Sequence, residues 1–382
     1  MRPFLMGIGK NACNRLEGQM SRFMTVAIIV AVGLLGIRSG AQTPPADLYS
    51  KLFPHATGQN GLEEIVRAGD ILANSPAVKE WEGAEKELTL TMKRRLLKDP
   101  QVAQTIMLYR QGLSKPIVFP TSDDEARFSS FAYLRRLARL ISVEQYVLFA
   151  EGKTSQAIDN LSGCLRLSYA IQGEGLIHGL VGIAMDAIAM KTILLHKDQL
   201  SEVDCKKLLA LSKEWLNAPG TSVHALTVEF EHILAGLEQT TKGQTDADRQ
   251  QIRDFMTLRM KRIIEMQKKP LYEREAVPPI LPNNTNAELV STLLSTAISD
   301  QLLTKFAMDR AKVQELGVNA ALMQYRWEHN KLPNSLTDLN VGKLTIDAVT
   351  GRQMNYKRLS DTNYELIVEG LIPPPVQNDQ SN

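Results

Sequence analysis

The chain has 382 residues, of which 44% are apolar and 23% are charged, the composition of a globular protein with enough apolar material for a sizeable core. Residues 1–41 hold five basic residues and one acidic residue; subtracting these from 44 and 42 leaves 39 basic and 41 acidic residues. A chain whose basic and acidic residues are so nearly equal in number lacks the basic patch of a nucleic-acid-binding protein. No nucleic-acid partner is therefore expected.

Residues 23–37 form an apolar run without charges, preceded by Arg22 and followed by Ser39, Gly40 and Ala41. A basic flank, a short apolar segment and small residues before a cleavage point are typical of a secretory signal. We therefore predict that residues 1–41 are a signal peptide, whose compact form starts at Met20, and that the protein is periplasmic or extracellular. In the alternative, residues 23–37 remain as an inner-membrane anchor, although the run is short for a membrane span of about 20 residues.

A mainly α protein is predicted from the apolar periodicity that follows. Residues 42–61 are interpreted as a tether and residues 62–269 as a helical body. Within that body, residues 122–195 carry apolar side chains at helical spacing and favour three consecutive helices, the first ended by Gly152. The turn within residues 146–161 is similar to that of a tetratricopeptide repeat, which indicates helical-hairpin packing. No second copy follows, so a repeat array is not expected.

The C-terminal third has a different pattern. Residues 270–284 are rich in proline and are interpreted as a linker, followed by a long helix over residues 285–330. Residues 331–370 are predicted to form a small β module with a two- or three-stranded antiparallel sheet, because residues 354–357 and 363–368 are rich in Tyr, Ile and Val. Residues 371–382 are expected to be a disordered tail.

This C-terminal region resembles the globular end of type II secretion pseudopilins. The residues that carry the resemblance are Tyr325-Arg326, Pro333-Asn334-Ser335-Leu336, Asp347, Gly351 and Tyr356. Ala348 stands where that family has a proline, and no prepilin peptidase motif or calcium-binding loop is recognisable. With its leader and helical body, the chain also resembles a group of uncharacterised exported bacterial proteins. The resemblance implies an architecture and a location, not an activity.

Three side chains form the best metal candidate in the sequence. Glu229 and His232 are three residues apart, the spacing that projects two ligands from one helix in di-metal four-helix bundles, and His224 precedes them. A second copy of this pair, which such a site needs, is not found. The alternative interpretation is a polar helix face. No cofactor-binding motif is present, so no cofactor is expected, and no residue is assigned a catalytic role.

Two cysteines, Cys164 and Cys205, follow the leader. In an oxidising compartment they can form one disulfide. The alternative is two unpaired buried thiols, which behave as small apolar side chains.

The function favoured by these patterns is that of a non-enzymatic structural or binding protein of the cell envelope, with a protein or peptide partner. Membrane contact is expected only if the leader stays uncut. The alternative is a helical hydrolase or lytic enzyme that acts on envelope polymer through a single acid in a groove, with Glu144 or Glu174 in that role. A groove acid with a raised pKa favours the enzyme, and an exposed apolar patch favours binding.

Overall fold

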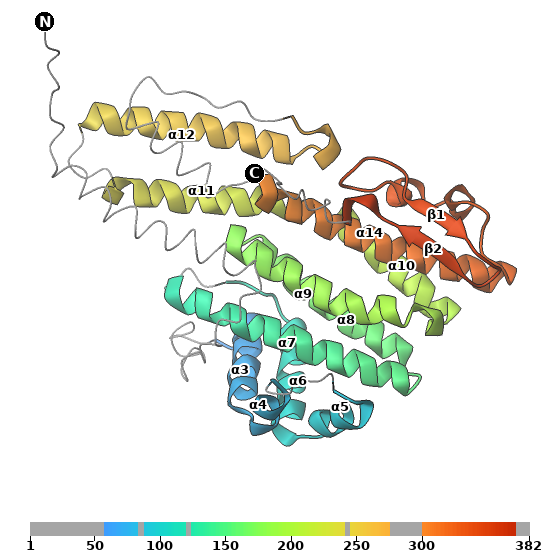
Figure 1. Cartoon of the computed structure of the whole chain (residues 1–382). Helices are drawn as coiled ribbons and strands as arrows, with labels where there is room; N and C mark the ends of the chain where they lie inside the picture. The colour runs from blue at the N-terminus through green and yellow to red at the C-terminus, as the bar shows by residue number, and fades with distance from the viewer. Residues whose placement is uncertain (1–56, 83–87, 120–123, 241–244, 276–299, 372–382) are drawn as a thin grey trace, which may run out of the picture.

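The computed structural model describes residues 57–82, 88–119, 124–240, 245–275 and 300–371. Within these ranges the protein is mainly helical with a small antiparallel sheet near its C-terminus, which confirms the predicted fold class (Figure 1). The predicted leader lies outside the described residues, as do most of the tether and all but one residue of the tail. Residues 276–299, which span parts of the predicted linker and long helix, also lie outside them.

An N-terminal layer consists of α3 (Gly61–Asn74), α4 (Pro76–Glu82), α5 (Leu90–Leu97) and α6 (Pro100–Leu113). The start of α3 crosses the end of α6 at two glycines. A Cβ atom added to Gly61 would lie 2.1 Å from the carbonyl oxygen of Gly112, and one added to Gly112 would lie 2.5 Å from the carbonyl oxygen of Gly61. Only residues without a side chain allow the two backbones to approach so closely.

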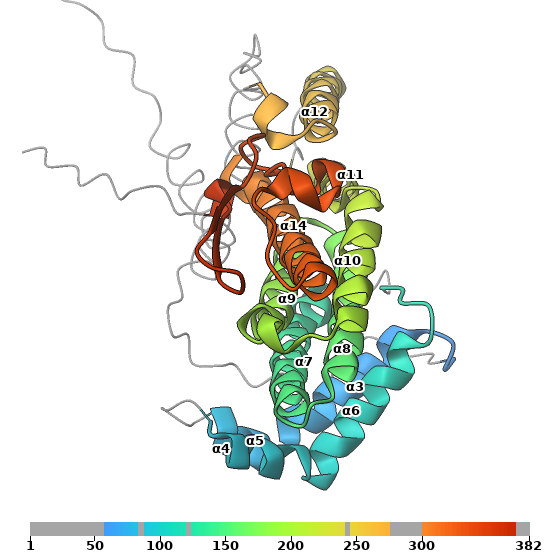
Figure 2. The same ribbon diagram turned by 90° about the vertical axis from the view of Figure 1, so that its right-hand side faces the viewer.

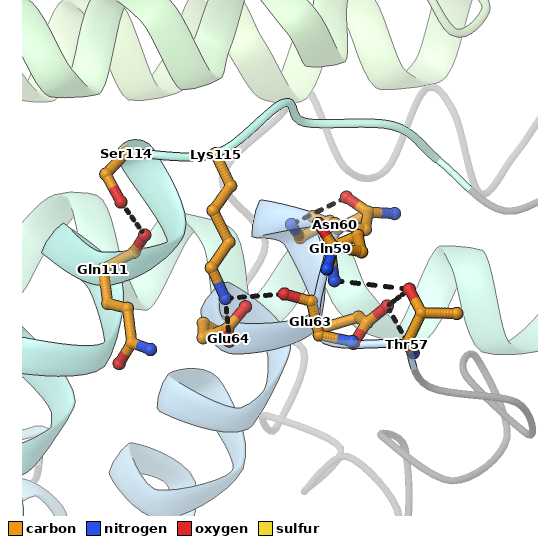
Figure 3. A network of polar contacts seen from close by, with 10 residues as sticks. Thr57, Gln59, Asn60, Glu63, Glu64, Gln111, Ser114 and Lys115 are labelled. Carbon is orange, nitrogen blue, oxygen red and sulfur yellow. Dashed lines mark hydrogen bonds and ion pairs between the residues drawn. The ribbon is translucent and has the colours of Figure 1, made fainter.

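Polar contacts fix the chain where it enters α3 (Figure 3). The Glu63 carboxylate accepts hydrogen bonds from the backbone amides of Thr57 and Gly58, at 3.2 and 2.8 Å. Lys115, just after α6, donates to the carbonyl oxygen of Gly58 at 2.9 Å and to the Glu64 carboxylate at 2.5 Å. The first described residues are therefore attached to both helices of the crossing.

The three predicted central helices are α7 (Asp124–Ala150), α8 (Thr154–Gln172) and α9 (Leu176–Leu195). Gly152 has a φ of +69° and reverses the chain between α7 and α8, as its sequence position predicts. Within the described ranges, α9 is the one helix long and apolar enough to cross a membrane, and most of it is buried inside the body. Because α9 packs on α7, α8 and α14, it is the central helix of the body.

A second helical layer follows. It comprises η1 (Lys197–Gln199), α10 (Glu202–Asn217), α11 (Thr221–Thr240), α12 (Asp246–Gln267), η2 (Leu271–Glu273) and α14 (Asp300–His329). α14 packs along α10, and α7, α8 and α9 lie between this pair and the N-terminal layer (Figure 2). α11 and α12 form a hairpin at the far end of the body (Figure 1).

The described residues form three hydrophobic clusters, the smallest of which, around Ile252 and Met256, lies between α11 and α12. The main core joins α3 to α10 with most of α14 and the C-terminal module. A smaller group, which we call the distal cluster, joins the first half of α9 to α11, α12 and the start of α14; its buried members are Leu176, Ile183, Ala225, Leu226, Met260, Leu302, Leu303 and Phe306. The hairpin of α11 and α12 is therefore attached to the body through a separate apolar contact.

The C-terminal module contains η3 (Leu336–Leu339), η4 (Gly342–Thr345), β1 (Asn355–Arg358), β2 (Tyr364–Ile367) and η5 (Glu369–Leu371). The two strands pair antiparallel, with Asn355 opposite Ile367 and Arg358 opposite Tyr364. The predicted strand pair is confirmed, and the sheet has two strands within the described residues.

The spacing of Pro333, Asp347, Gly351 and Tyr356 in this module has a structural explanation in its hydrogen bonds. The Tyr356 hydroxyl donates to the carbonyl oxygen of Pro333 at 2.8 Å. The buried Asp347 carboxylate accepts from the amides of Val349 and Gly370, at 2.8 and 2.7 Å. Gly351, with a φ of +70°, closes the turn after Asp347. These residues hold the loops and the sheet in one shape.

Candidate functional site

One buried polar group connects four helices of the body. Its centre is Gln172, at the end of α8. The Gln172 amide nitrogen donates to a carboxylate oxygen of Asp186 on α9 at 3.0 Å and to one of Asp309 on α14 at 3.1 Å. The same nitrogen lies 3.2 Å from the Ser168 hydroxyl, and the Gln172 amide oxygen accepts from the Thr221 hydroxyl of α11 at 2.7 Å. We call these five residues the Gln172 cluster.

The Gln172 cluster is closed to solvent at its carboxyl groups. Asp186 is 0% exposed and Asp309 is 1% exposed. Gly182 makes room for the cluster, because a Cβ atom at that position would lie 2.6 Å from Cγ of Gln172 and 2.8 Å from the carbonyl oxygen of Ser168. A glycine in α9 is therefore what allows α8 to present a long amide side chain to both acids.

Burial of two neighbouring carboxyl groups changes how they bind protons. Burial raises the pKa of Asp186 well above its ordinary value, and the nearby charge of Asp309 raises it further. Burial also raises the pKa of Asp309 to about 6, against the opposing effect of hydrogen bonds to Asp186 and Gln172. Two carboxylates in one apolar site cannot both ionise easily, so we infer that Asp186 keeps a proton when Asp309 is charged.

A small cavity lies beside the cluster. It has a volume of about 20 Å³, room for little more than one water molecule, and is lined by Tyr169, Trp215, Pro219, Gly220, Thr221, Ser222, Phe306 and Arg310. Thr221 is shared with the Gln172 cluster, but neither aspartate lines the cavity. The chemistry available to the two acids in this conformation is therefore proton binding, not contact with a substrate.

The predicted metal ligands lie on α11 in separate surroundings. Glu229 accepts a hydrogen bond from the backbone amide of Leu176 at 3.3 Å, so its carboxylate caps the start of α9. The exposed His224 lies against Gly173, and His232 is also exposed. Nowhere in the described ranges does a group of three His, Cys, Asp or Glu side chains form a potential metal site. The three candidates are thus not gathered as one ligand set.

The two cysteines are free thiols in the structure, and the disulfide considered from the sequence is not formed. Cys164 faces the core of α8, where its Sγ donates to the carbonyl oxygen of Met185 at 3.8 Å, and Cys205 is buried at the start of α10. Burial raises the pKa of the Cys164 thiol far above its ordinary value and that of Cys205 to about 12. Both thiols are therefore protonated and unreactive in the folded protein.

We expect a thiol reagent such as Ellman's reagent to label neither Cys164 nor Cys205 in native buffer and to label both in denaturant. The protein used should start at Gln42, because the leader contains Cys13. Rapid labelling of either cysteine in native buffer would contradict the buried geometry. Failure to label both in denaturant without reductant would indicate a disulfide.

The acids considered for a lytic enzyme are placed differently. Both oxygens of the Glu144 carboxylate are occupied, one by the Arg110 guanidinium at 2.9 Å and the other by the Asn160 amide at 2.8 Å. This arrangement connects α6, α7 and α8. Glu174 lies in the turn between α8 and α9. Neither acid belongs to the Gln172 cluster, whose two carboxyl groups have raised pKa values.

No protein-family model, curated protein or solved structure matches this chain. The interpretation of its function therefore depends on the sequence patterns and on the geometry of the residues described above.

Proposed function

We propose that this chain is an exported bacterial cell-envelope protein that binds a protein or peptide partner and has no catalytic role. Two sequence features support the location: the leader in residues 1–41, and the resemblance of the C-terminal module to the globular end of pseudopilins. The proposed partner is a component of the same envelope.

The observation that best supports binding is the state of Trp327, near the end of α14. Its indole Nε1 donates to the carbonyl oxygen of Leu200 at 3.0 Å, yet 51% of the residue is exposed. Val203, in the first turn of α10, is 72% exposed. Arg326, the residue before Trp327, forms an ion pair with Asp198 at 3.6 Å. A tryptophan held in place with part of its ring open to solvent is the residue type that contributes most at protein interfaces.

Photo-crosslinking in the native cells tests this proposal. A photoreactive amino acid at position 327 should give one discrete crosslinked product with an envelope protein. Met107 on α6 provides the control, because it is also apolar, is 57% exposed and lies in the N-terminal layer. The same product at both positions, or no product at position 327, would argue against a partner at Trp327.

A second experiment tests the enzyme alternative. If the purified protein releases soluble fragments from envelope polymer, and Glu144→Gln abolishes the release, the enzyme replaces the proposal.

Export gives a separate expected result. The protein isolated from the periplasm or medium should begin at Gln42, because the small residues before it fit signal peptidase. Mass spectrometry of the intact protein measures this directly. A protein that retains residues 23–37 in the membrane fraction would show that the run is an anchor, and one that stays in the cytosol would contradict export altogether.

A further inference from the structure

We propose that the Gln172 cluster makes the attachment of the distal part of the protein depend on pH. With its carboxyl pair protonated, the cluster holds α11 and the first turns of α14 on the body; loss of a proton weakens that attachment. This inference does not depend on the identity of the binding partner.

The position of the cluster carries the argument. Asp309 lies on α14 three residues after Phe306, a member of the distal cluster, and two residues before Ala311, a member of the main core. Thr221 is the first residue of α11, which belongs to the distal cluster. The hydrogen bonds of Gln172 to Asp309 and Thr221 therefore cross the boundary between the two apolar clusters.

The hydrogen-bonding capacity of the pair indicates that a proton belongs in it. Oδ1 of Asp186 and Oδ1 of Asp309 are both buried and have no hydrogen-bond partner in the part of the chain that the structure describes. Gln172 supplies one amide group to two carboxyls. A proton on Asp186 gives the pair a donor of its own, whereas two unprotonated carboxylates would leave buried charge without enough donors.

The ionisable groups that face the pair come from two helices. Cys164 on α8 is near Asp186, and its thiol is protonated. Arg310 and Lys312 on α14 favour the charged form of Asp309, but Arg310 already donates to the carbonyl oxygen of Leu216 at 2.5 Å and lies over the ring of Trp215. Neither base forms an ion pair with Asp309 within the described ranges, so the charge that appears on deprotonation is only partly compensated.

The direction of the pH effect follows from the raised pKa values. When the distal part opens, both carboxyls meet water and return to an ordinary pKa near 4. From about pH 4 to about pH 6 the open form therefore releases a proton that the closed form keeps, so each rise in pH favours opening. The attachment is fully effective below the ordinary pKa and is weakened as the pH passes the value of about 6 for Asp309.

Hydrogen exchange of the whole protein, corrected for the intrinsic exchange rate at each pH, measures this opening. Between about pH 4 and about pH 7 the opening constant of the amides of α11 and the first turns of α14 should rise by more than about a hundredfold. The shift of Asp309 by about two pKa units contributes about a hundredfold, and the raised pKa of Asp186 adds to it. Asp309→Asn should lower this rise about a hundredfold, since an amide does not titrate and the contribution of Asp309 is lost. The pH dependence that remains belongs to Asp186, whose pKa is still raised by burial. Asp159→Asn is the control, because Asp159 is exposed and pairs with Lys207 on the surface; it should behave as the natural protein.

Asp186→Asn is a second, independent variant and should also lower the rise, because the contribution of Asp186 is lost while that of Asp309 remains. The proposal is overturned if whichever of the two asparagine variants folds keeps the pH dependence of the natural protein. It is also overturned if the natural protein shows the same rise in α3 as in α11, because the effect would then be one of global stability and not of the distal attachment.

Discussion

Replacing Gln172 by leucine should lower the free energy of unfolding by about 3 kcal/mol. The leucine would remove the amide that donates to Asp186 and Asp309, and the Thr221 hydroxyl would lose its acceptor. Buried polar groups that lose their partners keep the full cost of leaving water. Urea unfolding followed by circular dichroism measures the change.

Gln145→Leu is the matched control for this experiment. Gln145 is as deeply buried as Gln172, but among the described residues its side chain makes a single long hydrogen bond, of 3.4 Å, to the carbonyl oxygen of Ala157. Its replacement should cost no more than about 1 kcal/mol. Equal losses for the two variants would show that Gln172 has no special role in joining the helices.

Alanine at Gly61 should destabilise the N-terminal layer by about 3 kcal/mol. The added methyl group would lie 2.1 Å from the carbonyl oxygen of Gly112 and 3.0 Å from the carbonyl carbon of the same residue. Because both atoms belong to the backbone of α6, no side-chain rotation relieves the contact, and α3 must move away from α6. The measurement is again equilibrium unfolding, together with hydrogen exchange in α3 and α6.

Gly220→Ala provides the comparison at a glycine without neighbours. No atom lies within 4 Å of a Cβ placed there, and its φ is not in the left-handed region. The change should alter the free energy of unfolding by less than about 0.5 kcal/mol. If Gly61→Ala were equally mild, the crossing of α3 and α6 would have to be looser than the structure shows.

The sequence predicted the elements of this fold better than their contacts. The apolar periodicity of residues 122–195 predicted three helices, because apolar side chains at helical spacing mark the face of a helix that is buried. Gly152 marked a helix end, and the Tyr, Ile and Val content of residues 363–368 marked a strand, because both signals are local. The same patterns could not show that Gly61 meets Gly112, since each glycine alone is compatible with a turn or a helix end.

The Gln172 cluster was not predictable for the same reason. The sequence shows Asp186 as a charged residue inside an apolar helix, and that position alone marks it as unusual. Asp309 lies in an amphipathic helix with many charged residues, and 137 positions separate it from Gln172. A hydrogen bond over that distance is set by the packing of α14 on α8 and α9, which no local pattern contains. The metal candidates are the opposite case, in which a local pattern suggested a site. Their spacing on α11 is that of metal ligands, but Glu229 caps another helix and the two histidines are exposed.

The hydrogen bonds of Glu63 to Thr57 and Gly58 also determine how far the body could stand from a membrane. They fix residues 57 and 58 against α3, and residues 38–56 separate these two residues from the apolar run. Nineteen residues span at most about 65 Å when fully extended. If the leader remains as an anchor, the N-terminal layer stays within that radius of the bilayer. The C-terminal module lies beyond α7, α8 and α9 as seen from the N-terminal layer (Figure 1), so this side of the molecule would be free to meet a partner deeper in the envelope.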